Sequence, residues 1–454
     1  MAVRGTTVGE GARLNAGPLS AAARGAAALA LAAALLLTGA LFLDRRDPLS
    51  GTIDPGGHAI ASLAWDMSGG IGALRARVRE RPDDPRALAA LGLAEVQVAR
   101  VTYDPSSYPR AEEALRRALA LDRTNVDAML GMGALSLSRH AFDEALRWGR
   151  LAVAANPYDA DAYGVLGDAQ LELGQYRRAF RTFQRMVDTE PNLASYARVS
   201  YALELQGDVP GAARAMEAAL DAAGTPADAA WAGFQLGELR FNAGDVAAAT
   251  GAYRRALGSA PDHVPSLAGL ARVAWARGRI DEAIALYERV IERYPAPEFV
   301  VAIVDLETVA GRTEDARRLE GLVRAQQLLA AANGVNVDLE LALFDADHGN
   351  PAAALAAARA EWERRKSVHV ADALAWALHA NGRDEEARAY AARALRLGTR
   401  NALFLFHAGM IERGLGHGGA ARRLLGEALE VNPRFSILHA GTAARVLERL
   451  EGGR

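Results

Sequence analysis

Histidines and carboxylates gather in the C-terminal part of the sequence, and both kinds of side chain bind metals or move protons. Six of the nine histidines lie between His348 and His439. The segment DADHGN, residues 345–350, has the oxygen and imidazole groups of a divalent-metal loop. Asp, Asn and His are also common in exposed turns and at helix caps. We therefore predict no metal site and no cofactor, and we keep metal or cofactor delivery by this histidine-rich half as an alternative hypothesis.

Adjacent carboxylates also suggest general acid/base catalysis. Asp281-Glu282 and Asp384-Glu385-Glu386 are such groups. Both stand where a helix is expected to begin, and carboxylates there favour the positive end of the helix dipole. The sequence has no HExxH or GxSxG motif and no phosphate-binding glycine loop. We predict that the protein is not an enzyme, and no catalytic residue is assigned.

Composition excludes further classes of site and partner. The chain has no cysteine, so disulfides, thiolate metal sites and cysteine nucleophiles are excluded. Its formal net charge is −3 and no segment is a sustained basic run. Nucleic-acid binding proteins need a basic surface for the phosphate backbone, so no nucleic-acid partner is expected.

A repeat of about 34 residues organises most of the chain and must position any site. In each copy a Gly is followed five residues later by an Ala. The pairs are Gly174/Ala179, Gly207/Ala212, Gly244/Ala249, Gly278/Ala283, Gly311/Ala316, Gly349/Ala354, Gly382/Ala387 and Gly416/Ala421. A period of this length is typical of a solenoid of stacked helical units.

Each recurring residue type within the unit has a physical reason. A Gly can adopt the left-handed conformation that ends one helix and turns the chain back. The Ala lies where the second helix crosses the first, and its small side chain lets the backbones approach. Tyr287 lies on the same helical face as Ala283, and Pro295 cannot continue the helix. One unit is therefore predicted to be a helical hairpin.

Leu-Gly pairs precede these turns at Leu91-Gly92, Leu166-Gly167 and Leu236-Gly237. Together with the Gly, Ala, aromatic and Pro positions, they resemble the tetratricopeptide repeat (TPR) family over about residues 83–435. Residues 160–193, 230–263 and 264–297 are the best units. The resemblance implies an all-α fold: a right-handed TPR superhelix, or α-solenoid, of about ten helical hairpins. Its first helices would line a concave groove that binds partner proteins.

The resemblance also implies which residues line the groove, at the second, fifth, ninth and twelfth positions of each first helix. The candidate partner-binding residues are Trp231, Phe234, Glu238, Phe241, Arg272, Trp275, His369, Asp372, Trp376, His379, Phe406, Met410 and Arg413. Earlier units supply Asp127, Asp161 and Asp168 instead. Aromatic and Arg side chains are over-represented at binding hot spots, so the later units are the expected partner face.

Two units depart from the pattern. Extra residues lie around VTYDPSS, residues 101–107, and Val304 stands where a Gly is usual. The second of these units continues into a longer helix around EGLVRAQQLLAAANG. Because each hairpin buries its apolar face only against neighbours, the ends need caps, and residues 71–81 and 436–450 are the candidates. The array is predicted to occupy residues 71–451.

The N-terminal part reads as a membrane anchor. Residues 25–43 are an uncharged apolar run, and at about 1.5 Å per residue such a helix nearly spans a bilayer core. A short tail, residues 1–24, precedes it, and a linker, residues 44–70, follows. A cleaved signal peptide is the competing reading. The arginines slightly favour the tail inside, which would place the array on the periplasmic or extracellular side.

These features predict a membrane-anchored TPR scaffold or adaptor at the cell envelope. It would bind partner proteins, whose identity the sequence does not give, and would have no catalysis of its own. An enzyme regulatory subunit would have the same sequence features, so that reading stays open.

Overall fold

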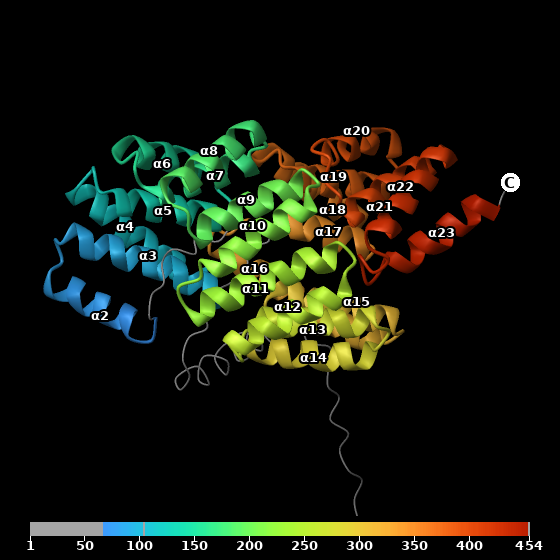
Figure 1. The fold of residues 1–454 in the computed structure, drawn as a ribbon, viewed down its shortest axis with the longest axis horizontal. Helices are drawn as coiled ribbons and strands as arrows, with labels where there is room; N and C mark the ends of the chain where they lie inside the picture. The colour runs from blue at the N-terminus through green and yellow to red at the C-terminus, as the bar shows by residue number, and fades with distance from the viewer. Residues whose placement is uncertain (1–66, 103–104, 453–454) are drawn as a thin grey trace, which may run out of the picture. The chain divides into compact units, whose positions relative to one another are not determined.

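The computed structural model describes residues 67–102 and 105–452, and every regular element in these ranges is helical (Figure 1). The first helices are α2 (Met67–Glu80), α3 (Pro85–Thr102), α4 (Tyr108–Leu121), α5 (Val126–Ser138), α6 (Phe142–Ala155), α7 (Ala160–Glu172), α8 (Tyr176–Thr189), α9 (Leu193–Leu205), α10 (Val209–Asp221), α11 (Pro226–Asn242) and α12 (Val246–Ser259). A short 3-10 helix, η2 (Pro105–Ser107), precedes α4. The others are α13 (Val264–Ala276), α14 (Ile280–Arg293), α15 (Pro297–Val309), α16 (Thr313–Ala332), α17 (Asp338–Asp347), α18 (Pro351–Arg364), α19 (Val368–Ala380), α20 (Asp384–Ala394), α21 (Ala402–Gly414), α22 (Gly418–Val431) and α23 (Ala440–Gly452).

From α3 to α22 these helices pair as hairpins, each first helix packing on the second helix that follows it. The pairs run from α3/α4 through α11/α12 to α21/α22, and each hairpin also contacts the next one. The described residues therefore form an all-α stack of paired hairpins, as predicted. α2 and α23 flank the stack, and α2 begins at Met67, just before the expected start of the array.

The glycine turns are confirmed. All eight repeat glycines have a positive φ, between 69° at Gly382 and 83° at Gly244. Only glycine adopts this conformation without strain, so each marks a tight turn between two helices. The paired alanines are buried as expected, with Ala283 fully covered and Ala316 4% exposed.

The irregular units keep the hairpin plan with local changes. His140 takes the turn between α5 and α6 with φ 58°, in the place of a glycine. The 3-10 helix η2 lies in the predicted insertion between α3 and α4. α16 is 20 residues long, which confirms the longer helix.

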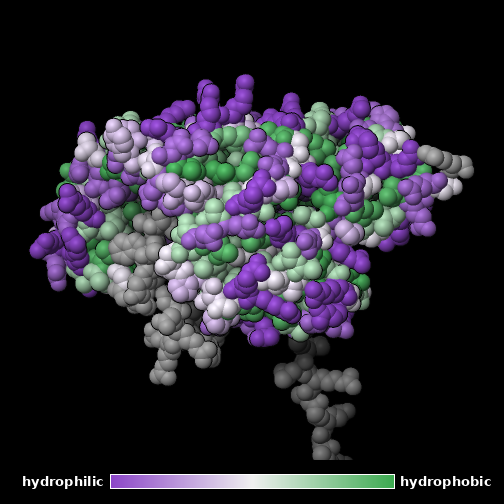
Figure 2. Space-filling view, viewed as in Figure 1, coloured by the Kyte–Doolittle hydropathy of each residue, from purple (hydrophilic) through white to green (hydrophobic). Residues whose placement is uncertain are grey.

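The surface matches the mixed composition. Hydrophilic side chains are spread over the face drawn in Figure 2, with small apolar patches between them. Apolar side chains of consecutive helices fill the interior, in a series of clusters along the chain.

The predicted tail, membrane segment and linker, residues 1–24, 25–43 and most of 44–70, lie outside the described residues. Within the described part, none of the helices combines the length and the apolar character needed to cross a membrane. The transmembrane helix and the right-handed superhelix stay predictions.

Candidate protein-binding surface

We call the thirteen predicted groove residues, from Trp231 to Arg413, the inner row. The structure brings some of them together across neighbouring first helices. Glu238 on α11 accepts a hydrogen bond from Arg272 on α13 at 2.8 Å, and the Tyr253 hydroxyl donates to Glu238 at 2.6 Å. The Arg272 guanidinium also lies 4.1 Å from the centre of the Phe241 ring. An ion pair and a cation–π contact therefore link the inner-row residues of α11 to those of α13.

The members of the inner row differ in their exposure. Several are packed in the core, where only a small part of each side chain is open to a partner: Trp231, Phe234, Phe241, Asp372, Trp376 and Phe406. Others are half-buried: Glu238, Arg272, Trp275, His369, His379 and Met410. Arg413 is exposed. The half-buried and exposed members are the ones that a partner can reach in this conformation.

Trp376 is the centre of an aromatic and histidine cluster in the later hairpins. Its ring stacks on His407 with 4.2 Å between centroids and on His379 with 5.0 Å. His439 meets the same ring edge-on at 5.4 Å. The Trp376 indole N–H donates to Asp347 at 2.7 Å. The cluster joins α17, α19 and α21 to the residues just before α23.

The histidines of this region are paired with carboxylates. His348 lies 3.0 Å from Asp305. His407 lies 2.9 Å from Asp372. His379 is paired with Asp384 in the same way, and His439 with Asp347. Each of these four contacts joins one histidine to a different carboxylate. No group of three or more potential ligands is placed to hold a metal in residues 67–102 and 105–452.

In two of these pairs, the pKa values of the side chains differ from their ordinary values. Burial disfavours the charged His348 ring, but the hydrogen bond with Asp305 and the negative charges of Asp305, Asp347 and Glu320 together outweigh that effect, so the pKa of His348 is raised. Burial also raises the pKa of Asp305. For Asp347, burial is outweighed by hydrogen bonds from His439 and Trp376, and the pKa of that carboxyl is lowered. The shifts favour the charged forms of His348 and Asp347 and the neutral form of Asp305.

A carboxyl next to the inner row has a strongly shifted pKa. Burial and the like charge of Glu238 raise the pKa of Glu204, on α9, to about 7. Tyr201, one helical turn earlier, stacks on His369 of α19 with 6.4 Å between centroids. The spacing of the repeat did not single out either residue, because both depend on which helices face each other.

The early aspartates have different surroundings. Asp127 is exposed on the first turn of α5, and Asp161 is half-buried on α7. Asp168 is fully buried and accepts two hydrogen bonds from Arg198, at 2.9 and 2.8 Å. Its charge is compensated inside the stack, so Asp168 is a structural residue rather than an open contact.

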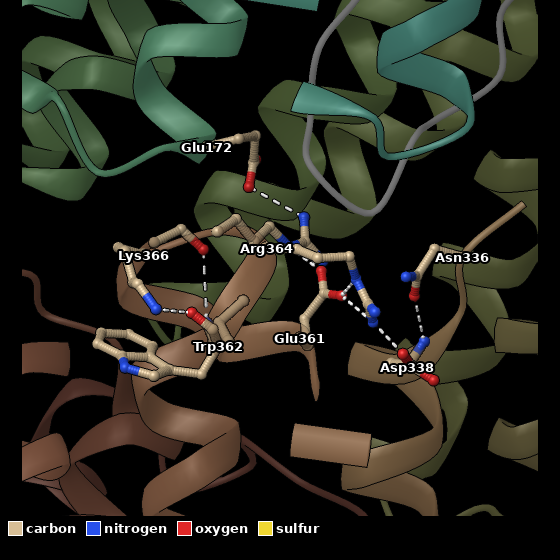
Figure 3. Close-up of polar contacts among 10 residues, drawn as sticks. Glu172, Asn336, Asp338, Glu361, Trp362, Arg364 and Lys366 are labelled. Atoms are coloured by element: carbon tan, nitrogen blue, oxygen red, sulfur yellow. Dashed lines mark hydrogen bonds and ion pairs between the residues drawn. The ribbon is translucent and has the colours of Figure 1, made fainter. Parts of the chain in front are cut away.

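A polar network that the sequence did not predict lies where α7 meets the end of α18 (Figure 3). Arg365, 4% exposed, donates to Glu172 of α7 at 3.0 Å and pairs with Glu361 of α18. Arg364 pairs with Glu361 at 2.9 Å and with Asp338 of α17. No signal in a 34-residue period could have found it, since Glu172 and Arg365 are 193 residues apart.

One pocket of about 550 Å³ lies at the end of the long helix α16 and the start of α17. Leu328, Val335 and Leu341 are among the residues that line it. Leu328 is 70% exposed, although the side chain is apolar. The charged residues that line the pocket are already paired: Arg324 with Asp345, and Asp338 with Arg364.

Comparison with known proteins supports the repeat assignment. A tetratricopeptide repeat model matches residues 99–160, 165–228, 201–264, 234–298 and 268–327. These matches fall on α3 to α16.

Relatives cover only part of the chain. Cellulose synthase 1 operon protein C of Komagataeibacter xylinus is 29% identical over 206 residues, which are 43% of this chain and 15% of that protein. Among solved structures, an APC/C hetero-tetramer of Cut9 and Hcn1 is 14% identical with a TM-score of 0.41, covering 84% of this chain and 81% of that one. A thermophilic TPR protein of Thermus thermophilus is 22% identical with a TM-score of 0.37, over 42% of this chain and 99% of that one.

Proposed function

The chain belongs to the tetratricopeptide repeat family and is a protein-interaction scaffold, and we propose that its partner binds the accessible part of the inner row without any chemical step. The observation that carries this proposal is the row itself. Trp275, His369 and Met410 are incompletely covered by their neighbours and stand on three separate first helices, at the twelfth, second and ninth positions of their units, all of them offsets that the repeat assigns to the groove.

The chemistry of the row indicates the kind of segment that fits. Trp275 and Met410 offer apolar contact, while Arg413 and the Glu238–Arg272 pair are charged, and the two members of that pair satisfy each other. A basic surface for phosphate or a purely acidic peptide is not formed by the inner row. An extended or helical segment that inserts apolar side chains between hydrogen-bonding groups matches this row.

We further propose that the scaffold is anchored in the cell envelope. The support is the uncharged apolar run at residues 25–43 and the arginines on its N-terminal side. With the tail inside, the hairpins would face the periplasm or the cell exterior. The similarity to a cellulose synthase operon protein covers only 15% of that protein, so we carry no substrate from it to this chain.

Site-specific photo-crosslinking in cells tests the binding face. A photoreactive residue at Arg413, on α21, should capture a discrete partner protein. The same residue at Glu430, exposed on α22, is the matched control and should not. If the partner protein is captured from Glu430 and not from Arg413, the binding surface lies on the second helices and the proposal is overturned.

A reporter fused after Arg454 tests the anchor. We expect activity only for a reporter that works after export, and we expect the purified protein to keep residues 1–43. A soluble protein with a new N-terminus near residue 40 would instead establish cleavage of a signal peptide.

A further inference from the structure

Turns of the early hairpins contact junctions of the late hairpins in a regular register. The turn after α7 meets the junction between α18 and α19, where the Tyr176 hydroxyl accepts a hydrogen bond from the Val368 N–H at 2.7 Å. The turn after α11 meets the junction after α22, where Asn432 donates to the Phe241 carbonyl at 2.8 Å. These two contacts span 192 and 191 residues.

Further contacts follow the same spacing. Tyr294, after α14, lies 3.5 Å from the Arg100 carbonyl near the end of α3, a span of 194 residues. Gly334, after α16, lies beside Arg139 at the turn after α5. We call this set of turn-to-junction contacts the seam. The turn after α9 also takes part, because Gly207 lies against Gly398. Five consecutive hairpin turns, after α3, α5, α7, α9 and α11, therefore belong to the seam, which follows one edge of the stack.

Glycines in the seam permit contact between backbones. A Cβ built on Gly174 would lie 2.5 Å from the Lys366 carbonyl oxygen, and one on Gly244 would lie 2.7 Å from that of Val431. At Gly207 the Gly398 carbonyl oxygen occupies the same place. Later repeat glycines such as Gly382 have the same positive φ but nothing within 4 Å. The early glycines are therefore needed for two reasons, the turn and the seam.

Buried charge and apolar contact reinforce the seam. Arg365 joins Glu172 across it, and Leu171 and Tyr176 share one apolar cluster with Val368 and Phe404. Opening the seam would separate the buried ion pair of Arg365 and Glu172, which is costly, so the closed arrangement resists opening. Contacts of this kind are absent from the later repeat turns: Gly278, Gly311, Gly349, Gly382 and Gly416 all face open space among the described residues.

The seam also reaches the inner row. His369, a member of that row on α19, stacks on Tyr201 of α9, and Glu204 follows one turn later. We propose that the seam is a latch, which closes the early hairpins against the late ones and controls entry of a partner segment to the inner row. The inference rests on the proposed binding face, but the latch itself can be tested without any partner.

Crosslinking tests the latch directly, because the full chain has no cysteine of its own. Gln206→Cys with Arg400→Cys places one exposed thiol on each side of the seam, beside Gly207 and Gly398. A short bismaleimide should link them within one chain. We expect Gly174→Ala to slow this link by about tenfold or more, since it displaces the Lys366 carbonyl. Gly382→Ala has the same backbone strain without a seam contact and should not slow it.

A second readout tests control of entry. A single thiol from Glu204→Cys should react with a maleimide about tenfold faster when Gly174→Ala is added, and at the original rate with Gly382→Ala. If linking slows but this labelling is unchanged, the seam exists and does not control entry, which overturns the latch. Equal linking in all variants, or no link in the parent, also overturns the latch while leaving partner binding untouched.

A milder pair of variants covers the case in which Gly174→Ala does not fold. Asn432→Ala removes the hydrogen bond to Phe241 across the seam, whereas Asn381→Ala removes bonds to Pro351 and Ala377 that lie outside it. The latch predicts slower linking and faster Glu204→Cys labelling for Asn432→Ala alone. Identical behaviour of the two variants contradicts it.

Discussion

The buried pair of Asp168 and Arg198 shows how a residue read as a binding candidate serves the fold instead. Both side chains are nearly inaccessible, and the guanidinium donates twice to the carboxylate. Arg198→Ala should lower the free energy of unfolding by about 3–5 kcal/mol, because it removes both guanidinium hydrogen bonds from a buried carboxylate. Arg240→Ala, which breaks an exposed pair with Glu217, should cost less than about 1 kcal/mol. Chemical denaturation measures both, and equal losses would contradict this account of Asp168.

Glu204 gives the inner side of the stack a pH dependence. Its pKa rises from 4.5 to about 7 on folding, so its contribution to stability is full below pH 4.5 and is lost as the pH rises through 7. Glu204→Gln should therefore flatten the fall in unfolding free energy between these pH values. Glu282→Gln, on the exposed start of α14, should leave the profile unchanged. If the Glu204→Gln variant has the same pH profile of stability as the parent, the surroundings do not raise the pKa of the Glu204 carboxyl.

Single residues of the site were only partly predictable. The offsets gave neighbours such as Glu238 and Arg272, which the structure pairs. The same offsets could not tell an aromatic side chain at the surface from one packed between helices, and Trp376 and Phe406 are of the second kind. Tyr201 was missed because its partner, His369, is distant in sequence.

At the scale of the hairpin the sequence was most informative. Glycine turns and alanine crossings depend only on local conformation and on the next helix, and the structure has them where the period placed them. The turn at His140 was the exception, since a non-glycine residue with positive φ leaves no compositional signal.

Overpacking one helix crossing tests the hairpin account. Ala283 is fully buried between α13 and α14, so Ala283→Trp should cost about 1–3 kcal/mol of stability. Glu282→Gln, one residue earlier and exposed, should cost well under about 1 kcal/mol. Thermal or chemical unfolding separates the two, and similar costs would mean that the assigned helix face is wrong.

At the scale of the whole described stack, the 34-residue period of the sequence could not predict the contacts of the seam. A repeat reports which hairpins are neighbours along the chain, whereas the seam joins positions 191–194 residues apart. Its existence depends on how far each hairpin rotates relative to the last, and small packing differences at every junction accumulate into that rotation.

The seam changes how far the effect of a destabilising substitution spreads through the stack. In an open solenoid a defect affects mainly the adjoining repeats. Arg365→Ala should instead raise hydrogen exchange in α7 and α8 as well as in α18 and α19, because it removes the ion pair that joins Glu172 to α18 across the seam. Exchange measured by mass spectrometry distinguishes the cases. Protection lost only in α18 and α19 would show that the seam carries no stability.

Binding of the purified partner, once captured from the inner row, tests the central claim most directly. The full chain, its Trp275→Ala variant and its Tyr158→Ala variant would be compared by calorimetry; Tyr158 is 82% exposed in the loop before α7 and is the aromatic control. We expect Trp275→Ala to weaken binding by about 2 kcal/mol with helical content unchanged, and Tyr158→Ala to bind as the parent does. Full-strength binding by a folded Trp275→Ala variant, together with loss of binding on Asp127→Asn or Asp161→Asn, would contradict the inner row as the partner face.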